Sequence, residues 1–117
     1  MYAFFHFLTH PVIDAPIRNS YKVDERIYAG EYPATSNETL GRKELSRFVK
    51  FGITHFIDLT EGGELSPYSQ WLPSECAYTR FGIKDCGVPR SMQEVTELLE
   101  IIIAIIKSDK NAKVYIH

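Results

Sequence analysis

The chain has 117 residues, of which 44% are hydrophobic and 24% are charged, and its 13 basic and 15 acidic residues give a net charge of -2. This length allows one domain with a modest core, and the composition is ordinary for a globular protein, so disordered and fibrous classes are excluded. The sequence has no block of basic residues, and we therefore expect no nucleic acid among its partners.

The cysteine content and the apolar runs indicate a cytoplasmic protein. Cys76 and Cys86 lack metal-type spacing and are too few for a disulfide scaffold. The amino-terminal residues are aromatic rather than cationic, and His6 and His10 interrupt them, so we expect neither a secretory signal nor a metal site there. The longest apolar run, residues 101 to 106, is too short to span a bilayer, so no membrane association is expected.

The first third of the chain is predicted to contain an irregular arm, a strand and a helix. Residues 1–20 form the arm, and residues 26–30 read as a short strand that breaks at a glycine. Apolar side chains then recur at helical spacing until Gly52 supplies a stop. The capping candidates and apolar positions of this helix are Thr35, Ser36, Asn37, Leu45, Phe48 and Val49.

Two strands and a turn are expected next. Residues 53–60 read as a mostly buried strand, and apolar and polar residues alternate over residues 77–83 as in a third strand. Between them, residues 66–73 are expected to form a loop or a short helical turn. That turn carries the only tryptophan, Trp71, which we expect to pack against the domain.

A long helix and a last strand end the chain. Ser91 followed by Glu94 predicts a capping box, and the helix that follows is apolar nearly all round, so it needs covering on more than one side. Residues 114–116 have the Val/Ile-rich character of a central parallel strand. The apolar helix positions are Val95, Leu98, Leu99, Ile101, Ile102, Ile103, Ile105 and Ile106.

This order of elements predicts an α/β fold with a central, mostly parallel sheet flanked by helices. Open sheets of this class place their chemistry at the carboxyl ends of the strands. The last strand ends at His117, where the chain also ends. We therefore expect a fold that is incomplete at its C-terminal end, poorly stable alone, and able to self-associate through the exposed terminal strand.

Four segments in this order resemble the amino-terminal part of the cysteine-dependent phosphatases of the protein-tyrosine and dual-specificity type. They are Asp24–Pro33, Gly52–Thr60, Phe81–Pro89 and Lys113–His117. In that family the last strand ends in His-Cys, followed by five residues and an arginine. The resemblance spans residues 21–117, which would be a partial phosphatase-like domain.

The resemblance implies hydrolysis of phosphate monoesters through a phosphocysteine, without a cofactor. Asp85 matches the general acid that protonates the leaving oxygen, and His117 matches the residue before the nucleophile. Taken alone, an aspartate in such an Asp-x-Gly segment is more often a solvated turn residue than a general acid, and only the family pattern favours the acid. Cys86 with Arg90, and Cys76 with Arg80, are spaced too closely to replace the nucleophile and its arginine.

Three interpretations follow from these residues. The first is the front part of such a phosphatase, acting on a phosphorylated protein or another phosphomonoester, and inactive as supplied because the nucleophilic cysteine and the arginine are absent. The second is a non-catalytic phosphatase-like interaction module. The third is a small α/β binding domain whose likeness to phosphatases is accidental. The sequence leaves open whether the substrate is a protein, a nucleotide or a lipid.

Overall fold

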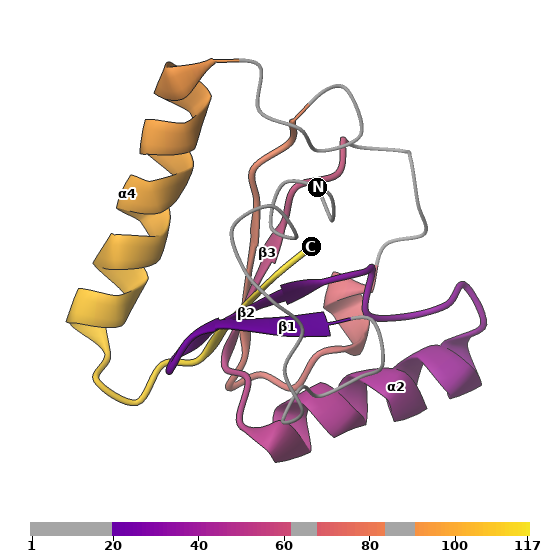
Figure 1. Ribbon diagram of the computed structural model, residues 1–117. Coiled ribbons are helices and arrows are strands. Elements are labelled where there is room, and N and C mark those ends of the chain that lie inside the picture. The colour runs from indigo at the N-terminus through magenta and orange to yellow at the C-terminus, as the bar shows by residue number, and fades with distance from the viewer. Residues whose placement is uncertain (1–19, 62–67, 84–90) are drawn as a thin grey trace.

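A computed structural model describes residues 20–61, 68–83 and 91–117, which build a five-stranded sheet with helices packed on both faces (Figure 1). The strands lie in the order β1-β2-β5-β3-β4. Their bounds are β1 Ser20–Asp24, β2 Ile27–Gly30, β3 His55–Asp58, β4 Ala77–Arg80 and β5 Val114–Ile116. The helices are α2 Glu38–Phe51, the short 3-10 helix η1 Ser69–Trp71, and α4 Met92–Ser108.

The sheet is mixed and mostly parallel, as the sequence predicted. β5 pairs in parallel with both β2 and β3, and β3 pairs in parallel with β4, whereas β1 and β2 are antiparallel. The described residues therefore form an α/β unit with β5 at its centre.

The expectation that the terminal strand is an exposed edge is wrong. β5 has a hydrogen-bonded neighbour on each side, because β2 and β3 both come from earlier in the chain and flank it. Strand pairing with another molecule uses unpaired edge groups, which β5 does not offer. Within the described sheet the outer strands are β1 and β4.

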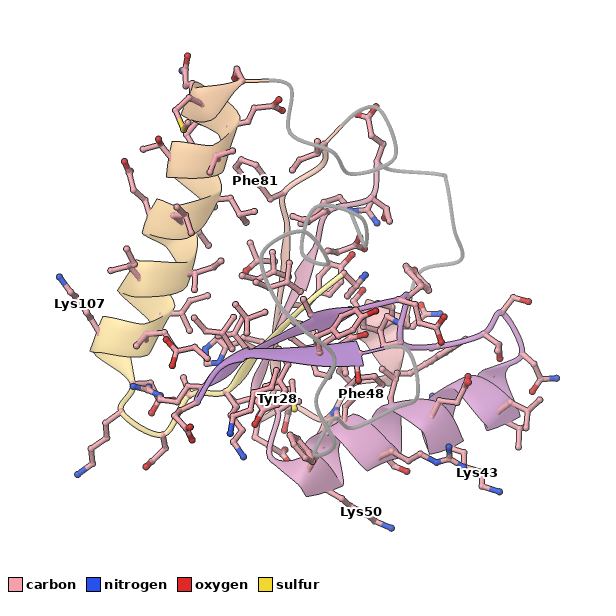
Figure 2. The ribbon with its side chains drawn as sticks, in the orientation of Figure 1. Tyr28, Lys43, Phe48, Lys50, Phe81 and Lys107 are labelled. Atoms are coloured by element: carbon pink, nitrogen blue, oxygen red, sulfur yellow. The ribbon has the colours of Figure 1, made fainter. Side chains whose placement is uncertain are left out.

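The helix α2 begins and ends at the capping residues that the sequence indicated. The Asn37 side chain accepts a hydrogen bond from the Leu40 amide at 3.0 Å, and Gly52 ends the helix at φ 112°, a conformation that favours glycine. Phe48 and Leu45 face the sheet and pack with Phe56 and other aromatic residues. In Figure 2, Phe48 points from α2 toward the sheet.

α4 covers the opposite face of the sheet (Figure 1). The Ser91 hydroxyl accepts a hydrogen bond from the Glu94 amide at 3.2 Å, as the predicted capping box requires. Leu98 and Ile102 are buried against the sheet. The apolar face is wider than this contact, because Met92, Leu99 and Ile103 are exposed by 76%, 50% and 49%.

The main difference from the sequence prediction is β1. The chain was expected to remain irregular to about residue 20 and to form its first strand at residue 26, whereas Ser20–Asp24 pairs with β2 as an antiparallel neighbour. β3 and β4 are also shorter than the predicted strands over residues 53–60 and 77–83. None of the described helices is long and apolar enough to cross a membrane.

Candidate active site at the carboxyl edge of the sheet

Polar side chains gather where the parallel strands end. β2, β5, β3 and β4 run in the same direction, so their carboxyl ends meet at one edge of the sheet. Ligands and chemistry in open α/β sheets are found at this edge. The β5 strand, drawn in yellow, runs to the chain end marked C at this edge (Figure 1).

The strand register aligns three polar residues across the edge. Ile57 pairs with Ile116, so the next residue on each strand, Asp58 and His117, lie side by side. The His117 amide continues the ladder by donating to the Ile57 carbonyl at 3.0 Å. Asp58 in turn pairs with Arg80 on β4.

These side chains lie on the α2 face of the sheet. Ile57 and Ile116 pack in the cluster that contains Leu98 of α4. Successive strand residues point to opposite faces, so Asp58 and His117 point to the other side. On that side they lie among the aromatic rings of Tyr32, Tyr68 and Tyr78, so the surroundings of the site are largely apolar.

Asp58 is a fully buried carboxylate whose oxygens are all engaged. Its Oδ1 accepts hydrogen bonds from the Thr60 amide at 2.9 Å and the Thr60 hydroxyl at 2.5 Å. Its Oδ2 accepts from the Tyr78 hydroxyl at 2.5 Å and, more weakly, from the Arg80 guanidinium at 3.4 Å. Burial acts to raise the pKa of Asp58, but the hydrogen bonds from Thr60 and Tyr78 outweigh it and hold the pKa below its usual value.

His117 is buried beside this carboxylate, with only 2% of its surface exposed. Its Nε2 lies 2.5 Å from the Tyr68 hydroxyl, and the Tyr32 ring meets it edge-on at 5.1 Å between centroids. Its Nδ1 lies 3.9 Å from Asp58 Oδ1 and has no hydrogen-bond partner among the described residues. Such an orphaned buried polar atom is uncommon in folded proteins and marks a functional position for testing.

The surroundings of His117 select one neutral tautomer. Burial lowers the pKa of His117 to about 4, although the Asp58 carboxylate acts in the opposite direction, so the ring is neutral at pH 7. A lone pair on Nδ1 would face the negative Asp58 oxygen, whereas an N–H there faces it favourably. Nδ1 therefore carries the proton, and Nε2 accepts the hydrogen bond that Tyr68 donates.

The tyrosines around the site act as hydroxyl donors. Burial raises the pKa of Tyr68 well above its usual value and that of Tyr32 to about 12, and the Asp58 charge adds to both shifts. Burial and the hydrogen bond to Asp58 also raise the pKa of Tyr78. All three phenols therefore stay protonated at neutral pH.

Neither Asp58 nor His117 is suited to proton transfer at neutral pH. A general acid or base works best with a pKa near the operating pH, whereas both of these pKa values are lowered. Asp58 is a fixed negative charge, and His117 is a buried, neutral donor. This arrangement suits positioning and electrostatic roles.

The described part of the chain includes only some of the predicted site residues. His117 lies at the carboxyl end of the central strand, as expected. Asp85 and Cys86 lie outside the described residues. Cys76 lies near the opposite edge, where burial raises the pKa of its thiol and Sγ lies 3.8 Å from the Ile53 carbonyl, so it is not an activated nucleophile.

Sequence reasoning missed four members of the cluster: Asp58, Tyr68, Tyr78 and Arg80. The sequence did contain a signal that Asp58 could belong to a site, because this carboxylate stands at the carboxyl end of a mostly apolar strand. The tyrosines carried no such signal, since their roles depend on which strands are neighbours. Among the described residues, no group of three or more histidine, cysteine or acidic side chains is arranged to hold a metal ion.

The chain matches no protein-family model, and it matches no curated protein.

Proposed function

We propose that the chain is the front part of a cysteine-dependent phosphatase of the protein-tyrosine or dual-specificity type. The observation that carries the proposal is His117, a buried neutral imidazole at the carboxyl end of the central strand, whose Nδ1 has no hydrogen-bond partner in the part of the chain that the structure describes. The strand β4 ends at the same edge and leads to the segment that contains Asp85. These positions agree with the resemblance in four sequence segments, which supports the same assignment.

The reaction would proceed in two balanced steps. A cysteine thiolate placed after His117 attacks the phosphorus, the bond to the leaving oxygen breaks, and Asp85 gives its proton to that oxygen. Water then attacks the phosphocysteine, Asp85 takes a proton from the water, and inorganic phosphate leaves as the thiolate is restored. The substrate class is a phosphate monoester, with a phosphorylated protein as the expected partner.

The described residues would support this chemistry without taking part in proton transfer. His117 presents Nδ1–H as a buried donor at the base of the loop that would follow it, where it can hold a backbone carbonyl. Tyr68 fixes that orientation through Nε2, and the Asp58 charge favours the same tautomer. The phosphate oxygens themselves need backbone amides and an arginine from the continuation.

The test is to read the coding sequence past His117 and to express the protein with that continuation. A cysteine, five residues and an arginine in frame, with turnover of p-nitrophenyl phosphate that a Cys-to-Ser change abolishes, would support the proposal. The 117-residue chain is the matched control and should show no turnover. A continuation that lacks the cysteine but retains the fold would reject the enzyme in favour of a non-catalytic interaction module.

A further inference from the structure

A groove of about 210 Å³ lies between α2 and the segment around η1. Among the described residues its lining is apolar at Leu45, Val49, Trp71 and Pro73, polar at Ser46, and charged at Arg42 and Lys50. Leu45 is buried, whereas Arg42 and Lys50 are exposed. Apolar surface therefore lies beside two exposed basic side chains, of which Arg42 forms an ion pair with Glu38.

The groove is built by close packing between Trp71 and the helix backbone. The Trp71 ring lies so near Gly41 that a Cβ atom at this position would be 2.4 Å from Trp71 Cζ3. The absence of a side chain at Gly41 lets the ring lie directly on α2. Both walls of the groove are thus held by the fold, and little ordering is needed when a ligand enters.

The size of the groove indicates what it can accept. Pockets that bind cofactors and drug-sized molecules usually enclose roughly 300–1,000 Å³. The present volume is smaller and suits one or two apolar side chains. A peptide that inserts an apolar residue and runs along the helix fits better than a small-molecule cofactor.

The charge of α2 indicates the chemistry of the peptide. The helix has four basic residues, Arg42, Lys43, Arg47 and Lys50, and two acidic ones, Glu38 and Glu44. Glu38 pairs with Arg42 at 2.8 Å, and Glu44 accepts a hydrogen bond from the Thr35 amide at 3.0 Å. Lys43 and Lys50 point away from the sheet (Figure 2). This local positive excess on a chain of net charge -2 is complementary to an acidic partner.

We propose that this groove binds an acidic peptide segment of a partner protein, with an apolar side chain against Trp71 and a carboxylate beside Lys50. The groove runs along α2 from Arg42 to Lys50, toward the amino end of β3. Its described lining residues are distinct from the cluster around Asp58 and His117. The proposal does not rest on the phosphatase assignment.

Trp71 makes the site directly observable, because it is the only tryptophan of the chain and it lines the groove. The probe is a short peptide with two central leucines flanked by aspartate and glutamate. One comparison peptide has serines in place of the leucines, and another has lysines in place of the acids. We expect a saturable change in Trp71 emission with the first peptide and affinities weaker by roughly tenfold or more with the other two. Calorimetry provides an independent measure of binding.

Charge-reversal variants distinguish a local effect of charge at the groove from a general effect of the protein's net charge. Lys50→Glu should weaken binding of the acidic peptide by roughly tenfold or more. Lys107→Glu is the matched control, because it makes the same change on α4, on the other face of the sheet, and should leave the affinity within about twofold. Circular dichroism and the urea midpoint verify that both variants are folded.

Three results would overturn the proposal. The first is that the acidic peptide changes neither the Trp71 emission nor the heat measured by calorimetry. Another is equal weakening by Lys50→Glu and Lys107→Glu, which would assign the effect to net charge. The third is binding to vesicles that contain phosphatidylserine without binding to the peptide, which would assign the basic face of α2 to a lipid surface.

Discussion

His117 Nδ1 lies 3.9 Å from Asp58 Oδ1 in the interior of the protein, and the two residues stand side by side on the neighbouring strands β5 and β3. The carboxylate is ionised and the imidazole is neutral, because burial lowers the pKa of His117 to about 4. The contact is therefore an interaction of an N–H dipole with a negative charge.

Acidification should destabilise the protein before the carboxylates titrate. Between the ordinary histidine pKa of 6.5 and the folded value of about 4, the unfolded chain binds a proton that folded His117 does not. The free energy of unfolding should therefore fall as pH drops through this interval, by on the order of 3 kcal/mol from His117. The lowered pKa of Asp58 should add a further loss only below about its usual value of 3.8. Urea unfolding at a series of pH values measures the change.

His55 provides the internal comparison for this experiment. Burial lowers its pKa as well, so it contributes to the same interval. NMR titration resolves the two rings in one sample and does not depend on a folded variant. A His117 ring that becomes protonated near pH 6.5 in the folded protein would contradict the prediction.

Tyr68→Phe should disturb the tautomer of His117. The change removes the hydroxyl that donates to Nε2 and leaves that nitrogen buried without its partner. We expect a loss of about 1–3 kcal/mol in the free energy of unfolding. Long-range ¹H–¹⁵N spectra should change from the Nδ1–H form alone to a mixture of tautomers.

Tyr78→Phe is the matched control for that variant. It removes the same atom from a neighbouring ring, but the lost hydrogen bond is to Asp58. The tautomer of His117 should persist, while the pKa of Asp58 should rise because a donor to its carboxylate is gone. If both variants gave the same His117 spectrum, Tyr68 would have no specific positioning role.

Asp58→Asn tests whether the buried charge stabilises the fold. Two strong donors, the Tyr78 and Thr60 hydroxyls, are directed at this carboxylate, and one of them would meet an amide N–H₂ group instead. We expect a loss of about 2–4 kcal/mol, since hydrogen bonds to charged groups contribute more than neutral ones. Asp24→Asn, at an exposed position, should change stability by less than about 0.5 kcal/mol. Thermal and urea unfolding compare the two variants, and equal effects would argue against the network.

The helices and the central strand were predictable because their signals are local. The Asn37 and Gly52 caps of α2 and the Ser91 cap of α4 lie within a turn of the residues that they satisfy. β5 was placed correctly at the centre by its Val/Ile-rich character. β1 was missed because its five residues are short, mixed in polarity and stabilised as a strand by pairing with β2.

The site was less predictable because it depends on strand order and register. Asp58 and Arg80 are 22 residues apart in sequence and meet only because β3 and β4 are adjacent and in parallel register. Tyr68 reaches His117 across 49 residues, from a loop whose path has no periodic signal. His117 was a candidate through the family resemblance alone, and nothing in its own sequence position indicated burial or a lowered pKa.

Gly41→Ala should destabilise the protein even though alanine favours helices. The added Cβ would lie 2.4 Å from Trp71 Cζ3 and 3.0 Å from the Thr35 carbonyl oxygen, so the ring must move. We expect a net loss of about 1–3 kcal/mol from overpacking, against a helix-propensity gain of about 1 kcal/mol. Trp71 emission during urea unfolding reports both the stability and the altered environment. Ser46→Ala, on the same helix, is the control, and an equal or higher stability for Gly41→Ala would disprove the close contact.

Asp85→Asn tests the proposed phosphatase in the protein expressed with its continuation. A general acid matters most when the leaving oxygen is a poor leaving group, because such an oxygen must be protonated as the bond breaks. Turnover of an alkyl or phenyl phosphate should therefore fall by about two orders of magnitude or more, and turnover of p-nitrophenyl phosphate should fall less. Asp109→Asn, in the turn that follows α4, is the control and should leave both rates unchanged. An equal loss for good and poor leaving groups would assign Asp85 a structural role, and an unchanged rate with the poor leaving group would remove Asp85 from the mechanism.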